Sequence, residues 1–291
     1  MHEATFPAMG TTAHVVVNGP EALVERARTR IEDLEALWSR FRPDSEVSRL
    51  NRHGSGRVSR DTEGLITRSI AGWRHTGGRF DPTVYRSMVQ LGYDTSFESI
   101  TTSTASREAT AAPGCGEIEV GGGVVRLPPG AGFDPGGIGK GLGADLVAEE
   151  LIADGADGAM VNLGGDLRAA GFSDAGAWVV RIDEPAAGVA ATVAFETGAV
   201  ATSTPLRRAW QQGAARRHHL IDPASGLPFD DRAPTLVSVV AAEAWFAEVC
   251  TKAAMALPPS LLEGALEDAA ALVAYRDGTV RLVNGMERYL R

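Results

Sequence analysis

The stretch FDPGGIGKGLGADL, residues 133–146, contains five glycines and one lysine within fourteen residues, and we predict that a helix begins near Gly143. Consecutive glycines allow backbone N–H groups to approach an anion, and the positive end of the helix dipole would point to the same place. Lys140 would add a point charge. The stretch is typical of a phosphate-binding segment, although a turn whose glycines only adopt positive φ angles explains the composition equally well.

Two common phosphate-binding motifs do not match this stretch. A P-loop requires glycine, four residues and then Gly-Lys-Ser/Thr, whereas Gly141 follows Lys140 here and Asp134 stands at the first glycine position. A dinucleotide-binding motif fits only approximately, because Ala144 takes its last position and the residues before it are not a buried parallel strand. These mismatches disfavour a kinase and a nicotinamide-dependent dehydrogenase.

The composition of the 291 residues indicates a globular protein with a substantial core, because 44% are hydrophobic and 22% charged. The net charge of −9 disfavours nucleic acid as a partner. No apolar run approaches the ~18 residues of a membrane span, and the N-terminal residues do not resemble a signal peptide. We therefore expect a cytoplasmic protein, with Cys115 and Cys250 as reduced thiols.

The order of predicted elements indicates the α+β class, because hairpins are mixed with isolated helices. Apolar residues at steps of three and four predict a long helix over residues 21–41. Further helices are predicted over residues 61–75, 143–154 and 243–257, and strands or hairpins over residues 12–19, 117–130, 158–171, 177–185, 191–204, 218–226 and 236–242. We expect one domain spanning residues 1–291, with a possible division into two subdomains near 96–116, a stretch rich in Ser, Thr and Ala.

Six segments, in sequence order, resemble motifs of one enzyme family. Asp134 to Gly141 resembles the D-x-G-G-I-x-K-G motif of the FAD:protein FMN transferase family, known as ApbE. The other five segments are PAMGTTAHV (7–15), WSRFRPDSEVSRLNR (38–52), GGRFDPTV (77–84), VNLGGDLRAAG (161–171) and HHLIDPASGLP (218–228). One such match is modest evidence, but six in the family's order are specific.

The resemblance implies the family's α+β fold, related to T-fold domains, with mixed sheets, flanking helices and a central FAD cleft. It implies transfer of FMN from FAD to a Ser or Thr of an acceptor protein, with release of AMP and Mg²⁺ on the pyrophosphate. Such a reaction depends mainly on positioning and charge neutralisation. The alternatives are an FAD-binding protein with impaired transfer, or an FAD pyrophosphatase if water replaces the acceptor hydroxyl.

The resemblance also assigns candidate residues. Met9 and Phe41 would lie against the flavin nucleotide's rings, and Phe41 stands where the family commonly has tyrosine. The candidates for catalytic roles are His219, Asp222 and Lys140. A histidine at position 219 could orient a phosphate or remove a hydroxyl proton. The full set of FAD-binding candidates is Met9, Phe41, Arg79, Phe80, Asp81, Asp134, Lys140, Asn162, Gly164, Gly165, Asp166 and Ile221.

Structural explanations compete with several of these assignments. Phe41 could be core packing at the end of the helical stripe, and Asp81 before Pro82 could be an ordinary turn acid. A structural turn explains residues 162–166 nearly as well as a cofactor site. Residues 207–219, RRAWQQGAARRHH, are predicted to form a hairpin with four arginines and two histidines. The arginines could attract pyrophosphate, dock an acceptor protein, or simply be solvated charges.

The last motif departs from the family pattern. The family has Ala-Asp-x-x-x-Thr, whose Asp and Thr bind Mg²⁺, whereas Glu248 and Lys252 take those positions here. The two share a helix face and could form an ordinary ion pair worth about 0.3–0.5 kcal/mol. Alternatively, the Lys252 ammonium partly replaces the metal, or Mg²⁺ is held by Glu248, the Gly137 carbonyl and Thr251. We expect an altered metal dependence.

Overall fold

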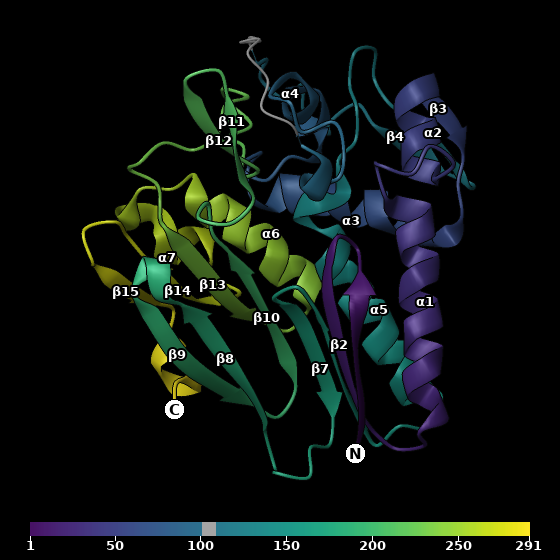
Figure 1. Ribbon diagram of the computed structural model, residues 1–291, viewed down its shortest axis with the longest axis vertical. Helices are drawn as coiled ribbons and strands as arrows, with labels where there is room; N and C mark the ends of the chain where they lie inside the picture. The colour runs from purple at the N-terminus through teal and green to yellow at the C-terminus, as the bar shows by residue number, and fades with distance from the viewer. Residues whose placement is uncertain (101–108) are drawn as a thin grey trace. The chain divides into compact units, whose positions relative to one another are not determined.

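The computed structural model describes residues 1–100 and 109–291 (Figure 1). Its contacts divide the chain into two compact units, each built from separate segments. The first unit comprises Met1–Glu35, Ile138–Ser203 and Arg232–Arg291, and the second comprises Ala36–Gly137 and Thr204–Asp231.

The expected division near residues 96–116 stays a prediction. Residues 101–108 of that stretch lie outside the described residues, and the residues on either side of them both belong to the second unit. No helix within 1–100 or 109–291 is both long and apolar enough to cross a membrane. The two cysteines are free and buried.

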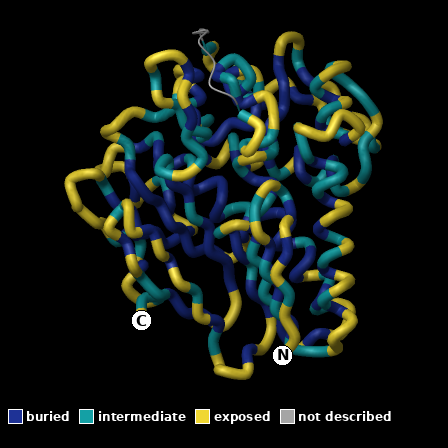
Figure 2. Tube along the Cα trace, viewed as in Figure 1, coloured by how far each residue is buried: buried dark blue, intermediate teal, exposed yellow. Residues whose placement is uncertain are grey.

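The first unit contains an eight-stranded sheet in which every neighbouring pair of strands is antiparallel. In spatial order its strands are β1 (His2–Ala8), β2 (Thr11–Asn18), β6 (Gly158–Leu163), β7 (Asp166–Gly171), β10 (Gly198–Ser203), β13 (Leu236–Ala241), β14 (Ala270–Ala274) and β15 (Val280–Val283). Strands β13 and β14 are buried along their whole length (Figure 2). Both faces of the sheet are therefore covered, which is why β13 is a run of apolar residues with a single serine.

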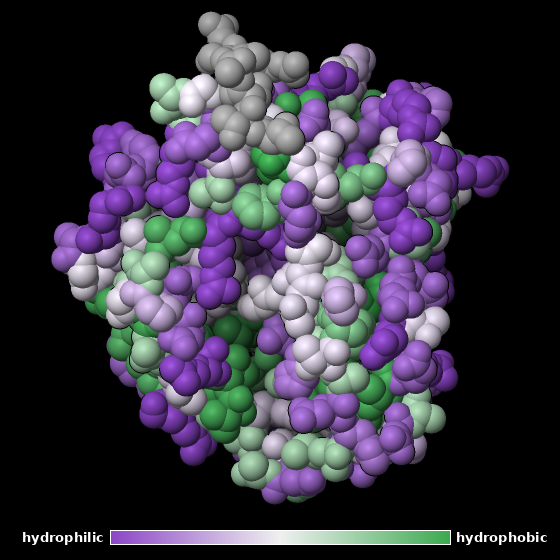
Figure 3. Space-filling view, in the orientation of Figure 1, coloured by the Kyte–Doolittle hydropathy of each residue, from purple (hydrophilic) through white to green (hydrophobic). Residues whose placement is uncertain are grey.

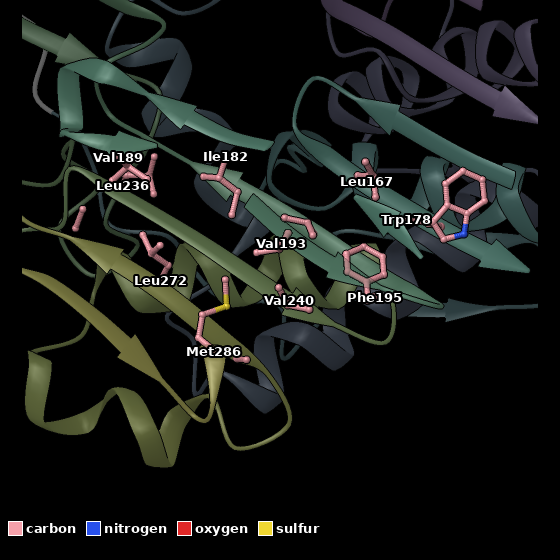
Figure 4. Close-up of a cluster of buried hydrophobic side chains, with 14 residues drawn as sticks. Leu167, Trp178, Ile182, Val189, Val193, Phe195, Leu236, Val240, Leu272 and Met286 are labelled. Atoms are coloured by element: carbon pink, nitrogen blue, oxygen red, sulfur yellow. The ribbon is translucent and has the colours of Figure 1, made fainter. Parts of the chain in front are cut away.

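Each face of the sheet has its own cover. Helices α5 (Gly139–Ala153) and α6 (Ala244–Met255) pack on one face, where Gly143 lies beside Leu163. The hairpin of β8 (Trp178–Glu184) and β9 (Val189–Phe195) covers the other face, where its apolar side chains form a core cluster with Leu167 (Figure 4). Because side chains alternate along a strand, Asp166 and Ser203 point to the helix face.

The second unit combines short elements. Helices α2 (Glu46–His53) and α3 (Arg60–His75) begin at Ser45 and Ser59, whose hydroxyls accept hydrogen bonds from backbone N–H groups. The remaining elements are α4 (Tyr85–Gln90), the sheet β3 (Ser55–Arg57), β5 (Val124–Arg126) and β4 (Glu119–Gly121), and the hairpin β11 (Ala209–Gln212) and β12 (Ala215–His218). Hydrophilic side chains cover the visible surface around α2 (Figure 3).

The remaining elements are one long helix and several short helices. Helix α1 (Ala22–Trp38) begins in the first unit, and its last residues belong to the second. The short elements are η1 (Pro82–Val84), η2 (Phe97–Ser99), η3 (Pro135–Gly137), η4 (Pro185–Ala187), η5 (Pro259–Leu261), α7 (Leu262–Ala265) and η6 (Met286–Tyr289).

The α+β class is confirmed, and several predicted boundaries are corrected. The predicted helix over residues 21–41 ends at Trp38, and the one predicted from Gly143 begins four residues earlier, so that Lys140 lies in the first turn of α5. The predicted strand over residues 218–226 is wrong, because β12 ends at His218 and a turn follows. Strand β1 was not predicted; it is an edge strand, which tolerates Pro7.

The close approach of α5 and α6 depends on Gly141. A Cβ atom there would lie 2.4 Å from the backbone oxygen of Ala244 and 2.8 Å from the backbone nitrogen of Trp245. Gly141→Ala should therefore lower the free energy of unfolding by about 1–3 kcal/mol, measured by urea denaturation. Gly64→Ala in α3 is the control, because its Cβ would meet only the flexible end of Arg68, and it should raise stability by about 0.5–1 kcal/mol. Equal effects at the two positions would contradict this account of the helix contact.

Candidate active site

Four ionisable side chains meet between the sheet and the helices of the first unit. We call Lys140, Asp166, Glu248 and Lys252 the charge quartet. The Lys140 ammonium lies 2.6 Å from both Asp166 Oδ2 and Glu248 Oε1, and the Lys252 ammonium lies 3.5 Å from Glu248 Oε1. Glu248 and Lys252 therefore share a face of α6 as predicted, but they are not an ordinary surface pair, because the Glu248 side chain is fully buried.

Burial and mutual attraction oppose each other in the quartet. Burial acts to lower the pKa of Lys140, but the charges of Asp166 and Glu248 outweigh it and raise that pKa. For Glu248, the charges of Lys140 and Lys252 outweigh burial and lower the pKa. Burial and the neighbouring Glu248 charge raise the pKa of Asp166 to about 6, and burial lowers the pKa of Lys252. With all four groups ionised, the quartet is electrically neutral.

The accessible side of the quartet carries positive charge. The side chains of Lys140 and Lys252 are each 17% exposed, whereas those of Asp166 and Glu248 are 3% and 0% exposed. An anion that approaches from solvent would therefore meet the ammonium groups first. This arrangement suits phosphate oxygens.

A second set of buried groups holds the helices that carry the quartet. The Asp145 carboxylate, on α5, accepts hydrogen bonds from the N–H groups of Ala244 and Trp245 at the start of α6, both at 2.8 Å. Conversely, Glu248 of α6 accepts the N–H of Gly141 in the first turn of α5 at 2.8 Å. Burial raises the pKa of Asp145 to about 7. Sequence reasoning missed Asp145, because its partners lie about a hundred residues away along the chain.

The remaining candidates of the first unit lie at two neighbouring turns. Asn162 accepts the N–H of Gly165 in the turn between β6 and β7. Gly164 has a φ of 68°, and a Cβ there would lie 2.3 Å from the Thr11 hydroxyl, so the turn fits closely against the start of β2. Met9, in the turn between β1 and β2, has a φ of 50°. These contacts explain the glycines structurally and leave their role in FAD binding a prediction.

In the second unit, Asp134 and Phe41 are linked through Arg40. The Arg40 guanidinium lies 3.2 Å from Asp134 Oδ2, and both side chains are 6% exposed. It also lies over the ring of Phe41, 4.3 Å from its centroid, and over the ring of Tyr93. Phe41 itself is 38% exposed, so its interpretation as core packing is wrong. Asp134 Oδ1 accepts the N–H of Gly136, next to Gly137 at the end of η3.

The segment from Arg79 to Asp81 leads into η1, and Asp81 caps the start of that short helix. Asp81 accepts hydrogen bonds from the N–H and the hydroxyl of Thr83, and burial raises its pKa. Phe80 is buried, and the exposed Arg79 donates to the backbone oxygen of Thr76. Asp81 is therefore a turn acid, as the structural explanation proposed.

Asp222 and Ile221 stabilise the turn that follows β12. Asp222 accepts hydrogen bonds from the Ala224 N–H and the Ser225 hydroxyl, and the Ile221 side chain is buried in a cluster with Trp210. His219 is the first residue after β12. The predicted arginine-rich hairpin is confirmed as β11–β12.

The hairpin borders a cavity of about 540 Å³ within the second unit. Arg208 and Arg216 line this cavity together with the aromatic side chains of Phe97 and Trp210. Two of the four arginines therefore face a cavity rather than open solvent alone. The role of these arginines in attracting an anion or a partner protein stays a prediction.

His218 should make the segment that follows β12 sensitive to pH, because its ring contacts Leu220 and Phe229. Its Nε2 lies 3.0 Å from the Phe229 oxygen and its Nδ1 accepts the Leu220 N–H, so the neutral ring fits and the protonated ring does not. Burial lowers the pKa of His218 below its ordinary 6.5. The unfolded chain therefore binds the proton more tightly, and stability should fall as the pH drops below 6.5.

His218→Asn keeps an acceptor for the Leu220 N–H but cannot titrate in this range. The melting temperatures of both proteins are measured from pH 6.5 downward. The melting temperature of the variant should depend less on pH than that of the wild type. Identical pH profiles would show that His218 does not contribute.

Comparison with known proteins identifies the family of this chain. The sequence model of the ApbE family matches residues 9–274. The FAD:protein FMN transferase of Vibrio cholerae is 29% identical over 243 residues, covering 78% of this chain and 72% of the relative. That of Treponema pallidum is 28% identical, covering 71% of this chain and 64% of the relative.

The fold is shared with the solved ApbE protein of Thermotoga maritima, with a TM-score of 0.86, 24% identity and 99% of each chain covered. The flavin transferase ApbE of Vibrio cholerae gives a TM-score of 0.80 at 23% identity, covering 99% of this chain and 98% of that one. The chain belongs to the ApbE family.

Proposed function

We propose that this chain transfers FMN from FAD to a serine or threonine hydroxyl of an acceptor protein and releases AMP. The observation that carries the proposal is the family match over residues 9–274, together with relatives named FAD:protein FMN transferase. The outward-facing ammonium groups of the charge quartet support it, because the reaction centre is a pyrophosphate. A cytoplasmic location stays a prediction.

The reaction needs a nucleophile, a base and neutralisation of phosphate charge. The acceptor oxygen forms a bond to the phosphorus of the FMN half, the bond from that phosphorus to the oxygen of AMP breaks, and AMP leaves as an anion. Lys140 would attract the phosphate oxygens, and His219 would take the hydroxyl proton. We propose Asp222 as a positioning residue, because its carboxylate is occupied by the turn that carries His219.

The FAD-binding candidates divide by what their side chains can offer. Phe41 is 38% exposed and could stack against a ring of the flavin nucleotide, although the Arg40 guanidinium already lies over its ring. Phe80 and Ile221 are buried, and Asp81 holds a turn, so we propose that these three shape the binding surface rather than donate to FAD. The remaining candidates, which stay proposals as contacts of FAD, are Met9, Arg79, Asp134, Asn162, Gly164, Gly165 and Asp166.

An intact-mass assay tests the transfer. The chain is incubated with FAD and a flavin-acceptor domain, with MgCl₂ present so that a metal requirement does not decide the result. We expect FMN added to the acceptor, release of AMP, and no addition to an acceptor whose target threonine is replaced by valine. AMP together with free FMN would indicate a pyrophosphatase instead, and bound FAD without AMP would indicate a binding protein.

His219→Ala should lower the transfer rate by about 10²–10⁴-fold, because a general base contributes that much. The control is Asp277→Asn, an exposed turn residue whose hydrogen bond to the Thr279 N–H an asparagine can keep. It should leave the rate unchanged. A wild-type rate for His219→Ala would show that another group removes the proton.

A further inference from the structure

The Lys252 ammonium lies among oxygen atoms of the kind that bind a metal ion. It donates to Ser203 Oγ at 2.9 Å and to Thr251 Oγ1 at 3.3 Å, and it lies 3.5 Å from Glu248 Oε1. Ser203 belongs to β10 and the other two residues to α6, so oxygens from two elements surround the ammonium. Carboxylates and hydroxyls are also ligands of Mg²⁺.

The oxygens around Lys252 are already engaged. Glu248 Oε1 accepts from Lys140 at 2.6 Å, and Glu248 Oε2 accepts the N–H of Gly141. The Thr251 hydroxyl donates to the Glu248 backbone oxygen and lies 2.7 Å from Ser203 Oγ. Among the described residues, Asp166 Oδ1 is the one carboxylate oxygen of the quartet without a hydrogen-bond partner.

Mg²⁺ does not fit this set of groups. It requires near-octahedral oxygen ligands at about 2.0–2.1 Å, whereas two ammonium groups already share the carboxylates. The quartet is neutral as it stands, so a divalent ion would add two uncompensated positive charges at a buried site. In the part of the chain that the structure describes, no three His, Cys, Asp or Glu side chains are grouped so as to hold a metal ion.

From these contacts we infer that the Lys252 ammonium takes the place of the divalent cation, so that this protein carries its own positive charge at the site. The cation is covalently attached, and its presence does not depend on the metal concentration. That this charge acts on the FAD pyrophosphate rests on the proposed function. That Lys252 replaces a bound metal ion does not rest on it.

The substitution Lys252→Thr provides a gain-of-function test. It removes the ammonium group, and with it one positive charge, from among the oxygens of Ser203, Thr251 and Glu248, and it adds one hydroxyl. The oxygens of Glu248, Ser203 and Thr251 would then border the space that the ammonium leaves. The three remaining ionised groups, Lys140, Asp166 and Glu248, would carry a net charge of −1. Lys252→Met is the matched control, because it removes the charge but keeps an unbranched stem and supplies no oxygen ligand.

The readout is Mg²⁺ binding by the FAD-free protein, measured by calorimetric titration and by the melting temperature in EDTA or in millimolar MgCl₂. We expect no saturable binding and no shift for wild type and Lys252→Met. Lys252→Thr should bind Mg²⁺, and its melting temperature should rise with the Mg²⁺ concentration, because a ligand that binds only the folded state stabilises it.

Two results of the Mg²⁺ binding measurements would overturn the inference. The first is saturable Mg²⁺ binding by the wild-type protein in the absence of FAD. The second is a folded Lys252→Thr protein that binds no Mg²⁺.

A measurement on the wild type alone covers the case in which the variant does not fold. Its affinity for FAD, followed by flavin fluorescence, should agree within twofold between EDTA and MgCl₂. A tenfold loss in EDTA would overturn the inference. Because none of these readouts uses transfer to an acceptor, a negative transfer assay would leave them interpretable.

Discussion

The candidate site depends on a reciprocal arrangement of two carboxylates and two helix N-termini. Asp145 of α5 accepts the first N–H groups of α6, and Glu248 of α6 accepts an N–H in the first turn of α5. Each carboxylate satisfies donors that a helix leaves unpaired at its start, and each lies where the helix dipole favours negative charge. Gly141 permits the close approach that both contacts need. This crossing places Lys140 against Glu248, and the rest of the quartet follows from it.

The sequence predicts those parts of the site that depend on local spacing. The shared face of Glu248 and Lys252 follows from a step of four in a helix, and the hairpin β11–β12 follows from its turn residues. Family motifs brought Lys140 and Asp166 onto the same list of candidates, but their 2.6 Å contact is a product of the tertiary fold. The sequence also predicts the α+β class, because the predicted helices and strands have clear periodicity.

Other features depend on partners that are distant in the chain. The sequence around Asp145 does not predict its role, because that role depends on a contact with the start of α6. Ser203 gains its contact with Lys252 only because alternation on β10 turns it toward α6. The helix α5 begins earlier than predicted for a related reason: glycines normally disfavour a helix, but here close packing against α6 requires a glycine at position 141.

The division of the molecule into units has a consequence for how the chain acquires its structure. The backbone passes from one unit to the other four times, at residues 35, 137, 203 and 231. The eight-stranded sheet places β10, which begins about two thirds of the way along the chain, between β7 and β13, and one of its edges is formed by β14 and β15 near the C-terminus. During synthesis, almost the whole polypeptide must therefore leave the ribosome before this sheet is complete. Until then, edges of the strands that are made first stay unpaired. Neither unit can be cut out as a continuous fragment, because each is built from separate segments of the chain.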